Sequence, residues 1–157
     1  FSFKQFKTVF WIVTFFTLGH SVSLFFSAYG IYSPPEKIIE ILIPITIVIT
    51  GINNIYKSNS TVSYNLSSFT ISLLFGLIHG FGFGNYFNQI SFPLESKINP
   101  LIGFAFGVEA SQLIIVLGIL IINLLIVKLG SINLRNYIRI VSSIIIGFSL
   151  NMILNLI

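Results

Sequence analysis

Three ionisable side chains stand inside long apolar stretches of this sequence. They are His20, His79 and Glu109, and Gln112 follows Glu109 by about one helical turn. Ionisable groups are costly in apolar surroundings and, where they occur there, usually serve binding or transport. Imidazoles and a carboxylate are ligands that Zn²⁺ and Ni²⁺ accept. The three residues are therefore candidate ligands of a divalent metal ion. A hydrogen-bonded cluster with only a structural role is the alternative interpretation.

The stretches that carry these residues have the composition of membrane helices. Of 157 residues, 55% are hydrophobic and 8% are charged, whereas soluble domains carry roughly 25% charged residues. Five apolar blocks reach the length of about 20 residues that spans a bilayer. We therefore predict an all-α, polytopic helix bundle that forms a single transmembrane domain over residues 1–157. Its expected helices cover residues 6–29, 36–56, 66–87, 101–127 and 137–157.

The basic residues lie mainly at one set of helix ends, and only Lys37 and Lys97 lie at the other set. Lys and Arg concentrate at the cytoplasmic ends of membrane helices. We therefore expect a protein of the bacterial inner membrane, with the N-terminus of this chain in the cytoplasm and its C-terminus outside. The residues that predict this orientation are Lys4, Lys7, Lys57, Lys128, Arg135 and Arg139.

Charge and cysteine usage limit the expected partners. The net charge of +4 comes from a few basic residues between apolar blocks, which indicates membrane topology and no nucleic-acid partner. The sequence contains no cysteine, which excludes disulfides and thiolate metal ligands from this chain. The expected partners are membrane lipid and either a second copy or a larger membrane complex.

Helix spacing places the three ionisable residues at one depth. His20 lies nine positions before Tyr29, His79 lies eight before Phe87, and Glu109 lies nine after Pro100. At 1.5 Å per residue, each lies roughly 12–14 Å from the same face of the bundle. We therefore expect three helices to present their ionisable groups to a common site.

Small residues spaced by four accompany these groups. Such stripes let membrane helices approach closely, so we expect the first, third and fourth helices to pack together. The packing glycines are Gly76, Gly80 and Gly84 on the third helix, and Gly103 and Gly107 on the fourth. Four polar residues are expected to support the ligands by hydrogen bonds, namely Thr17, Ser21, Ser23 and Gln112.

Three segments of the chain resemble motifs of HupE/UreJ-type membrane proteins. The segment FTLGHSVSL around His20 resembles FTxxHSxTL, and FGLIHGFGF around His79 resembles FGLxHGxGF. The segment FAFGVEASQL around Glu109 resembles FNxGVExGQL. Ser23 stands where the family has Thr, and Ser111 stands where it has Gly. Neither departure removes a candidate ligand.

The resemblance implies a longer protein and a metal-related role. Family members begin with another membrane helix, of the form GxxHxxxGxDH, so we expect six helices in the full protein. Such proteins are regarded as permeases for nickel or another metal, or as accessories of metal insertion. On this basis the chain is expected to be an integral membrane protein with an intramembrane site for Zn²⁺ or Ni²⁺.

Two other functions fit the same residues. One is an intramembrane metal-dependent hydrolase for a lipid or lipid-linked substrate, with Glu109 as a metal ligand or general base. The other is a structural subunit of a membrane assembly. The sequence does not decide whether the protein is an enzyme.

Overall fold

Helices account for nearly all of the computed structural model, which describes residues 6–57, 66–91, 96–129 and 133–157. All five helices are long and apolar enough to cross a membrane, and the described residues contain no strand. The prediction of an all-α transmembrane bundle is confirmed. The helices are α1 (Phe6–Ala28), α2 (Glu36–Lys57), α3 (Leu66–Ser91), α4 (Ile98–Leu129) and α5 (Leu134–Leu156).

Three helix ends differ from the sequence prediction by three or four residues, and the other ends agree to within two. The helix α3 continues four residues beyond Phe87, and α4 begins three residues earlier than expected. Pro100 therefore lies in the first turn of α4, where proline is tolerated because the first amide groups have no intrahelical acceptor. The helix α5 begins at Leu134, where the side chain of Asn133 accepts a hydrogen bond from the backbone amide of Arg135 at 3.1 Å.

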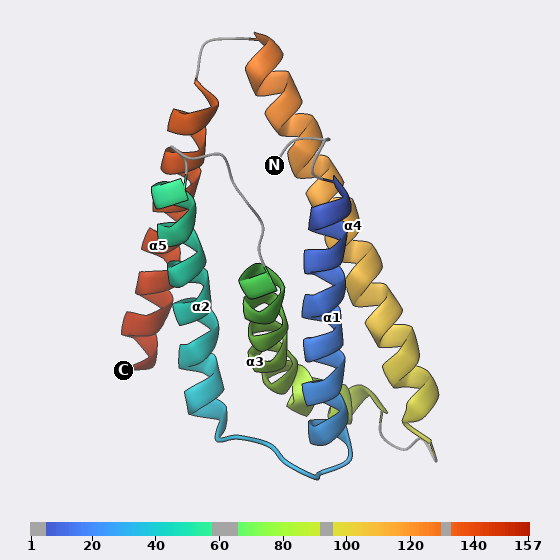
Figure 1. Cartoon of the computed structure of the whole chain (residues 1–157). Coiled ribbons are helices and arrows are strands. Elements are labelled where there is room, and N and C mark those ends of the chain that lie inside the picture. Colours follow the sequence, from blue (N-terminus) through green and yellow to red (C-terminus); the bar gives the residue numbers. More distant parts are fainter. Residues whose placement is uncertain (1–5, 58–65, 92–95, 130–132) are drawn as a thin grey trace.

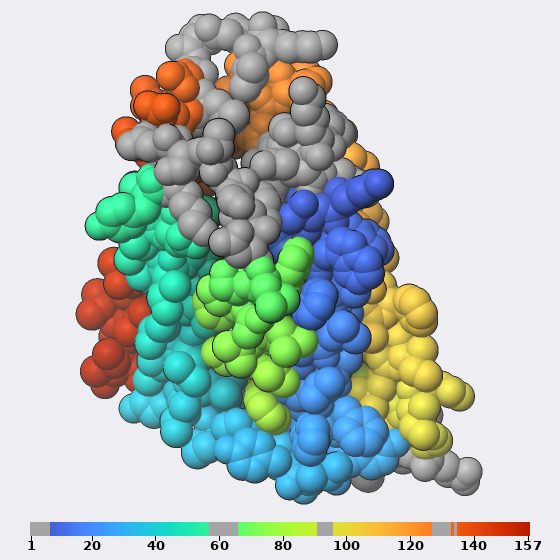
Figure 2. Space-filling model, in the orientation of Figure 1, coloured from blue at the N-terminus to red at the C-terminus, as the bar shows by residue number. Residues whose placement is uncertain are grey.

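The helices stand side by side in the order α5, α2, α3, α1 and α4 (Figure 1). The most extensive packing joins α1 to α3, and α2 packs mainly on α5. Figure 2 shows α3 between α2 and α1 on the visible face. The outer helices α4 and α5 contact each other only slightly. Much of the apolar surface of α4 is therefore available to lipid.

Glycine brings the backbones of α1 and α3 into direct contact. A Cβ atom at Gly76 would lie against the carbonyl oxygen of Phe16, and one at Gly80 would lie against the carbonyl oxygen of His20. Gly19 makes the reciprocal approach from α1 to the backbone of α3. In a membrane such contacts replace the hydrophobic effect as the source of helix association. The helix that carries His20 is thus held against the helix that carries His79.

Polar contacts along the same pair show that α1 and α3 run parallel. The hydroxyl of Ser72 donates to the carbonyl oxygen of Ile12 at 2.7 Å, and Nδ2 of Asn88 donates to that of Ser27 at 3.3 Å. Between them, Gly84 lies against the side chain of Ser27. Residues that come later in α3 therefore contact residues that come later in α1. These contacts fix the register between the two helices.

A lysine fastens α4 to the other two helices. Nζ of Lys97 donates to the carbonyl oxygen of Ala28 at 2.7 Å and to Oδ1 of Asn88 at 2.9 Å. A cation at the C-terminus of a helix is favourable because the last carbonyl groups carry partial negative charge. We call this end of the bundle the Lys97 end, and the opposite end, where α1 begins, the Lys7 end.

The glycines of α4 do not behave like those of α3. A Cβ atom at Gly103 or Gly107 would meet no described atom within 4 Å. The close packing expected of these two residues is therefore absent from the described part of the chain. The contacts between α4 and α1 are made by Phe104, Glu109 and Lys97 instead, because these side chains reach across a wider separation.

We predict that Gly76→Ala destabilises the protein by about 1–3 kcal/mol, the usual cost of overpacking. The added methyl group meets a backbone carbonyl, which no side-chain rotation can move away. Gly103→Ala is the matched control, since its methyl group enters open space and alanine favours a helix by about 1 kcal/mol over glycine. Thermal unfolding in detergent measures both. Equal midpoints for the two variants would contradict the close contact between α1 and α3.

Candidate functional site

His20 is a buried imidazole without a hydrogen-bond partner. Its side chain is 7% exposed, and neither Nδ1 nor Nε2 has a partner among the described residues. Its ring stacks on Phe16 at a centroid distance of 6.1 Å and on Phe104 at 5.8 Å. An unsatisfied buried polar group costs about 1–3 kcal/mol. The geometry therefore leaves both nitrogens available to a ligand.

His79 is oriented by the backbone of its own helix. Its Nδ1 lies 2.8 Å from the carbonyl oxygen of Phe75. A carbonyl oxygen only accepts, so the hydrogen of this bond is on Nδ1. In the neutral ring the lone pair is then on Nε2, which is the arrangement found in metal-binding histidines. The side chain is half-buried.

The register between α1 and α3 brings the two imidazoles together. Both rings contact Phe16, whose ring centroid lies 5.3 Å from that of His79 and 6.1 Å from that of His20. The structure thus brings together two of the three candidate ligands.

Glu109 lies apart from this pair. Its Oε1 accepts a hydrogen bond of 2.7 Å from the hydroxyl of Thr14, and Thr14 precedes His20 by six residues, or about 9 Å along α1. Within the described ranges, no three His, Cys, Asp or Glu side chains form a group that could hold a metal ion. The common depth expected from the sequence therefore holds for His20 and His79 but does not extend to Glu109.

The reason lies in how α4 sits against α1. The helix α4 begins at Ile98 and is fastened at Lys97 to Ala28, the last residue of α1. Glu109 is therefore twelve residues from this fixed point, whereas His20 is only eight from it. The carboxyl group is carried past the imidazoles, toward the Lys7 end.

The polar residues expected to support His20 are directed elsewhere. The hydroxyl of Ser23 donates to the backbone oxygens of Gly19 and His20, each at 3.1 Å. Oγ1 of Thr17 is buried and has no partner among the described atoms, and Ser21 is half-buried. None of the three bonds to the imidazole of His20.

Aromatic rings surround the imidazole pair, and sequence reasoning did not select them. Phe83 contacts both His20 and Phe104, at centroid distances of 6.4 and 4.7 Å. Together with Phe16, these rings enclose His20 in an apolar cage. Their spacing in the sequence could have identified two of them. Phe16 precedes His20 by four residues and Phe83 follows His79 by four, which places each phenylalanine on the same helix face as its histidine.

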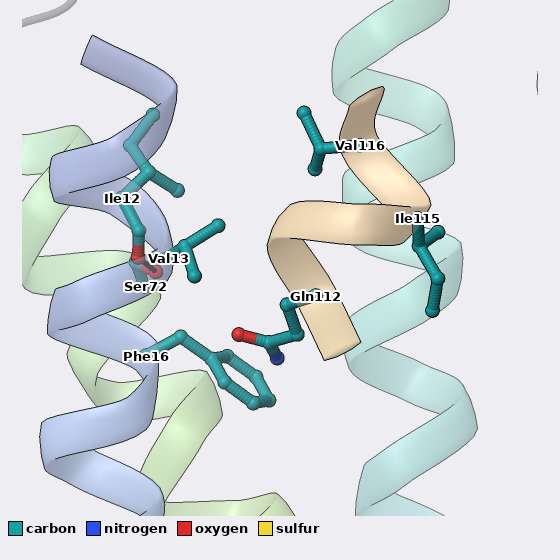
Figure 3. Close-up of a pocket in the computed structure, with 7 residues that line it drawn as sticks. All are labelled: Ile12, Val13, Phe16, Ser72, Gln112, Ile115 and Val116. Carbon is teal, nitrogen blue, oxygen red and sulfur yellow. Dashed lines mark hydrogen bonds between the residues drawn. The ribbon is translucent and has the colours of Figure 1, made fainter. Parts of the chain in front are cut away.

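A cavity of about 270 Å³ is lined by Phe16 and lies nearer the Lys7 end than the imidazole pair does. Figure 3 shows Phe16 and Ser72 on one wall and Gln112 of α4 opposite, while the remaining lining is isoleucine and valine. Oε1 of Gln112 is buried and has no hydrogen-bond partner in the described structure. Gln112 thus lines a cavity, and no described hydrogen bond joins it to Glu109.

The sequence profile described as HupE / UreJ protein matches residues 1–155. The chain belongs to the HupE/UreJ family. The match spans all five helices and confirms the resemblance that the three motifs indicated. Comparison with curated proteins and with solved structures returns no significant match.

Two threonines one helical turn apart in this HupE/UreJ protein give opposite predictions. Thr14→Val removes the donor to Glu109 and should lower the free energy of unfolding by about 1 kcal/mol or more. Thr17→Val removes a buried hydroxyl that has no partner in the described part of the chain, and it should be neutral or stabilising. Chemical unfolding in detergent measures both. Equal destabilisation by the two variants would contradict the assignment of the hydrogen bonds.

Proposed function

We propose that this protein is a permease for a divalent metal ion, such as Ni²⁺ or Zn²⁺, and that His20 and His79 bind the ion inside the membrane. The observation that carries the proposal is the buried imidazole of His20, whose two nitrogens have no partner among the described residues, beside a second imidazole. Membership in the HupE/UreJ family adds support for a membrane role.

The chemistry of the pair suits these ions. Neutral imidazole is a good ligand for Zn²⁺ and Ni²⁺. The bond from Nδ1 of His79 to Phe75 directs the lone pair of Nε2 away from the backbone of α3. Two protein ligands leave coordination positions for water. An incomplete shell favours transport over permanent retention, because a transported ion must also leave.

The depth of the pair also favours transport. Within α1, which spans Phe6–Ala28, His20 lies eight residues from Ala28, or about 12 Å from that end. This places the imidazoles only a few residues from the middle of the helix. Transporters bind their ions near the bilayer midplane. We further propose that the Lys7 end is cytoplasmic, in a bacterial inner membrane, on the strength of the lysine and arginine bias.

The hydrolase alternative receives less support. It needs a carboxylate beside the metal as ligand or general base. The hydrogen bond between Thr14 and Glu109 keeps the nearest described carboxyl group on α4 about a turn and a half from His20. A scissile bond in a lipid headgroup also lies nearer the membrane surface than the imidazole pair does. We therefore prefer transport.

Purified protein is expected to bind Ni²⁺ or Zn²⁺, and His20→Ala or His79→Ala should weaken binding by about tenfold or more, or about 1.4 kcal/mol. Isothermal titration with each metal chloride measures the affinity. Asn123→Ala is the matched control, because Oδ1 of Asn123 is also buried without a described partner but lies on α4 near the Lys7 end. Unchanged binding in both histidine variants would favour a structural role for the pair.

Transport is a separate expectation from binding. Proteoliposomes that contain the protein should take up ⁶³Ni²⁺ faster than empty liposomes, and the double variant of His20 and His79 to alanine should return uptake to the empty-liposome rate. The reason is that an ion gives up part of its water inside the bilayer, where His20 and His79 supply nitrogen ligands in its place. Tight binding without uptake would contradict the permease proposal and would favour a metal-binding accessory role.

A further inference from the structure

The cavity beyond Phe16 contains oxygen atoms that the imidazole pair does not use. Oε1 of Gln112 is buried without a described partner and is directed from α4 toward Phe16 (Figure 3). Ser72 also lines the cavity, and its oxygen remains free to accept because its hydrogen is donated to Ile12. The other lining side chains are apolar, so these oxygens are the polar groups that a ligand in the cavity would meet.

Glu109 is bonded at a level nearer the Lys7 end than Phe16, because its partner Thr14 precedes Phe16 by two residues on α1. It precedes Gln112 by three residues, which places both side chains on one face of α4. Its carboxyl group is bonded to Thr14, which adjoins the cavity-lining residue Val13. Oxygens of a carboxyl group, an amide and hydroxyls thus gather at neighbouring levels on α1, α3 and α4. These levels are closer to the Lys7 end than the imidazoles are.

Phe16 separates the two groups of ligands. Its ring contacts both imidazoles and also lines the cavity, whose other residues on α1, Ile12 and Val13, lie nearer the Lys7 end. It lies ten residues from the start of α1 and twelve from its end, so it is near the middle of the helix. Phe16 is therefore the side chain that the imidazole pair and the cavity share.

We propose that Glu109 and Gln112 form a second, oxygen-based position for the divalent ion, and that Phe16 is the gate between this position and the imidazole pair. The proposal rests on the permease function proposed above and adds a direction to it. Oxygen ligands hold Ni²⁺ and Zn²⁺ less tightly than imidazoles do. An ion that passes Phe16 therefore moves from a nitrogen site to a weaker one, from which it leaves toward the Lys7 end.

Single-cysteine labelling tests the gate without any metal. The sequence contains no cysteine, so Gln112→Cys introduces a unique thiol into the full chain. A membrane-impermeant methanethiosulfonate should label it from the Lys7 end only. Adding Phe16→Ala should raise labelling from the Lys97 end by about tenfold, the effect of lowering a barrier by about 1.4 kcal/mol.

Phe15→Ala is the matched control, because Phe15 is the adjacent aromatic residue but contacts Phe69 instead of the imidazoles. It should leave the labelling pattern unchanged. If Phe16→Ala does not fold, Phe16→Leu takes its place with a smaller increase expected. Labelling of Gln112→Cys from both ends with Phe16 present, from neither end, or from one end regardless of the residue at position 16 would overturn the gate.

The second position is tested with ⁶³Ni²⁺. Glu109→Gln should slow uptake by about tenfold while the dissociation constant measured by titration stays within about twofold, because the imidazole pair remains. Ser111→Ala, an exposed neighbour on α4, should change neither quantity. If Glu109→Gln abolishes binding, Glu109 belongs with the imidazoles and the second position is rejected. If the unaltered protein binds no metal, the permease proposal fails, while the labelling result still decides whether Phe16 is a barrier.

Discussion

The contact between the backbones of α1 and α3 is the constraint on which the candidate site depends. Where Gly76 faces the carbonyl oxygen of Phe16, no side chain lies between the two helices. Helices in such contact have little freedom to slide, because each glycine accommodates one carbonyl group of the neighbour. The register that results places His20 beside His79. Glycines, which carry no side chain, therefore determine that the two imidazoles lie next to each other.

Hydropathy predicted the fold well because the bilayer itself restricts the answer. A helix that crosses it needs about 20 apolar residues, and five blocks of that length stand out in this sequence. The start of α4 was less predictable. Asn99 and Pro100 are typical of a loop, yet a proline in the first turn of a helix is also common. A depth that is counted from a helix end changes by 1.5 Å for each residue by which the predicted end is misplaced.

The composition of the site was only partly predictable. His20 and His79 stand out because ionisable residues are rare in these helices, whereas 17 phenylalanines make any one of them uninformative in the sequence. Phe16 gains significance only from the two imidazoles that it contacts. The partner of Glu109 is Thr14 and not a histidine, and this depends on the offset between α1 and α4, which no residue pattern specifies.

The attachment of α4 has a consequence for motion. Backbone contact joins α1 and α3 over several turns, whereas α4 is held to them by side chains, chiefly at Lys97, Phe104 and Glu109. Elements with fewer buried contacts open at lower free energy. A swing of α4 about its fastened end would withdraw Phe104 from one face of His20. The two imidazoles would keep their mutual geometry throughout, because α1 and α3 move as one body.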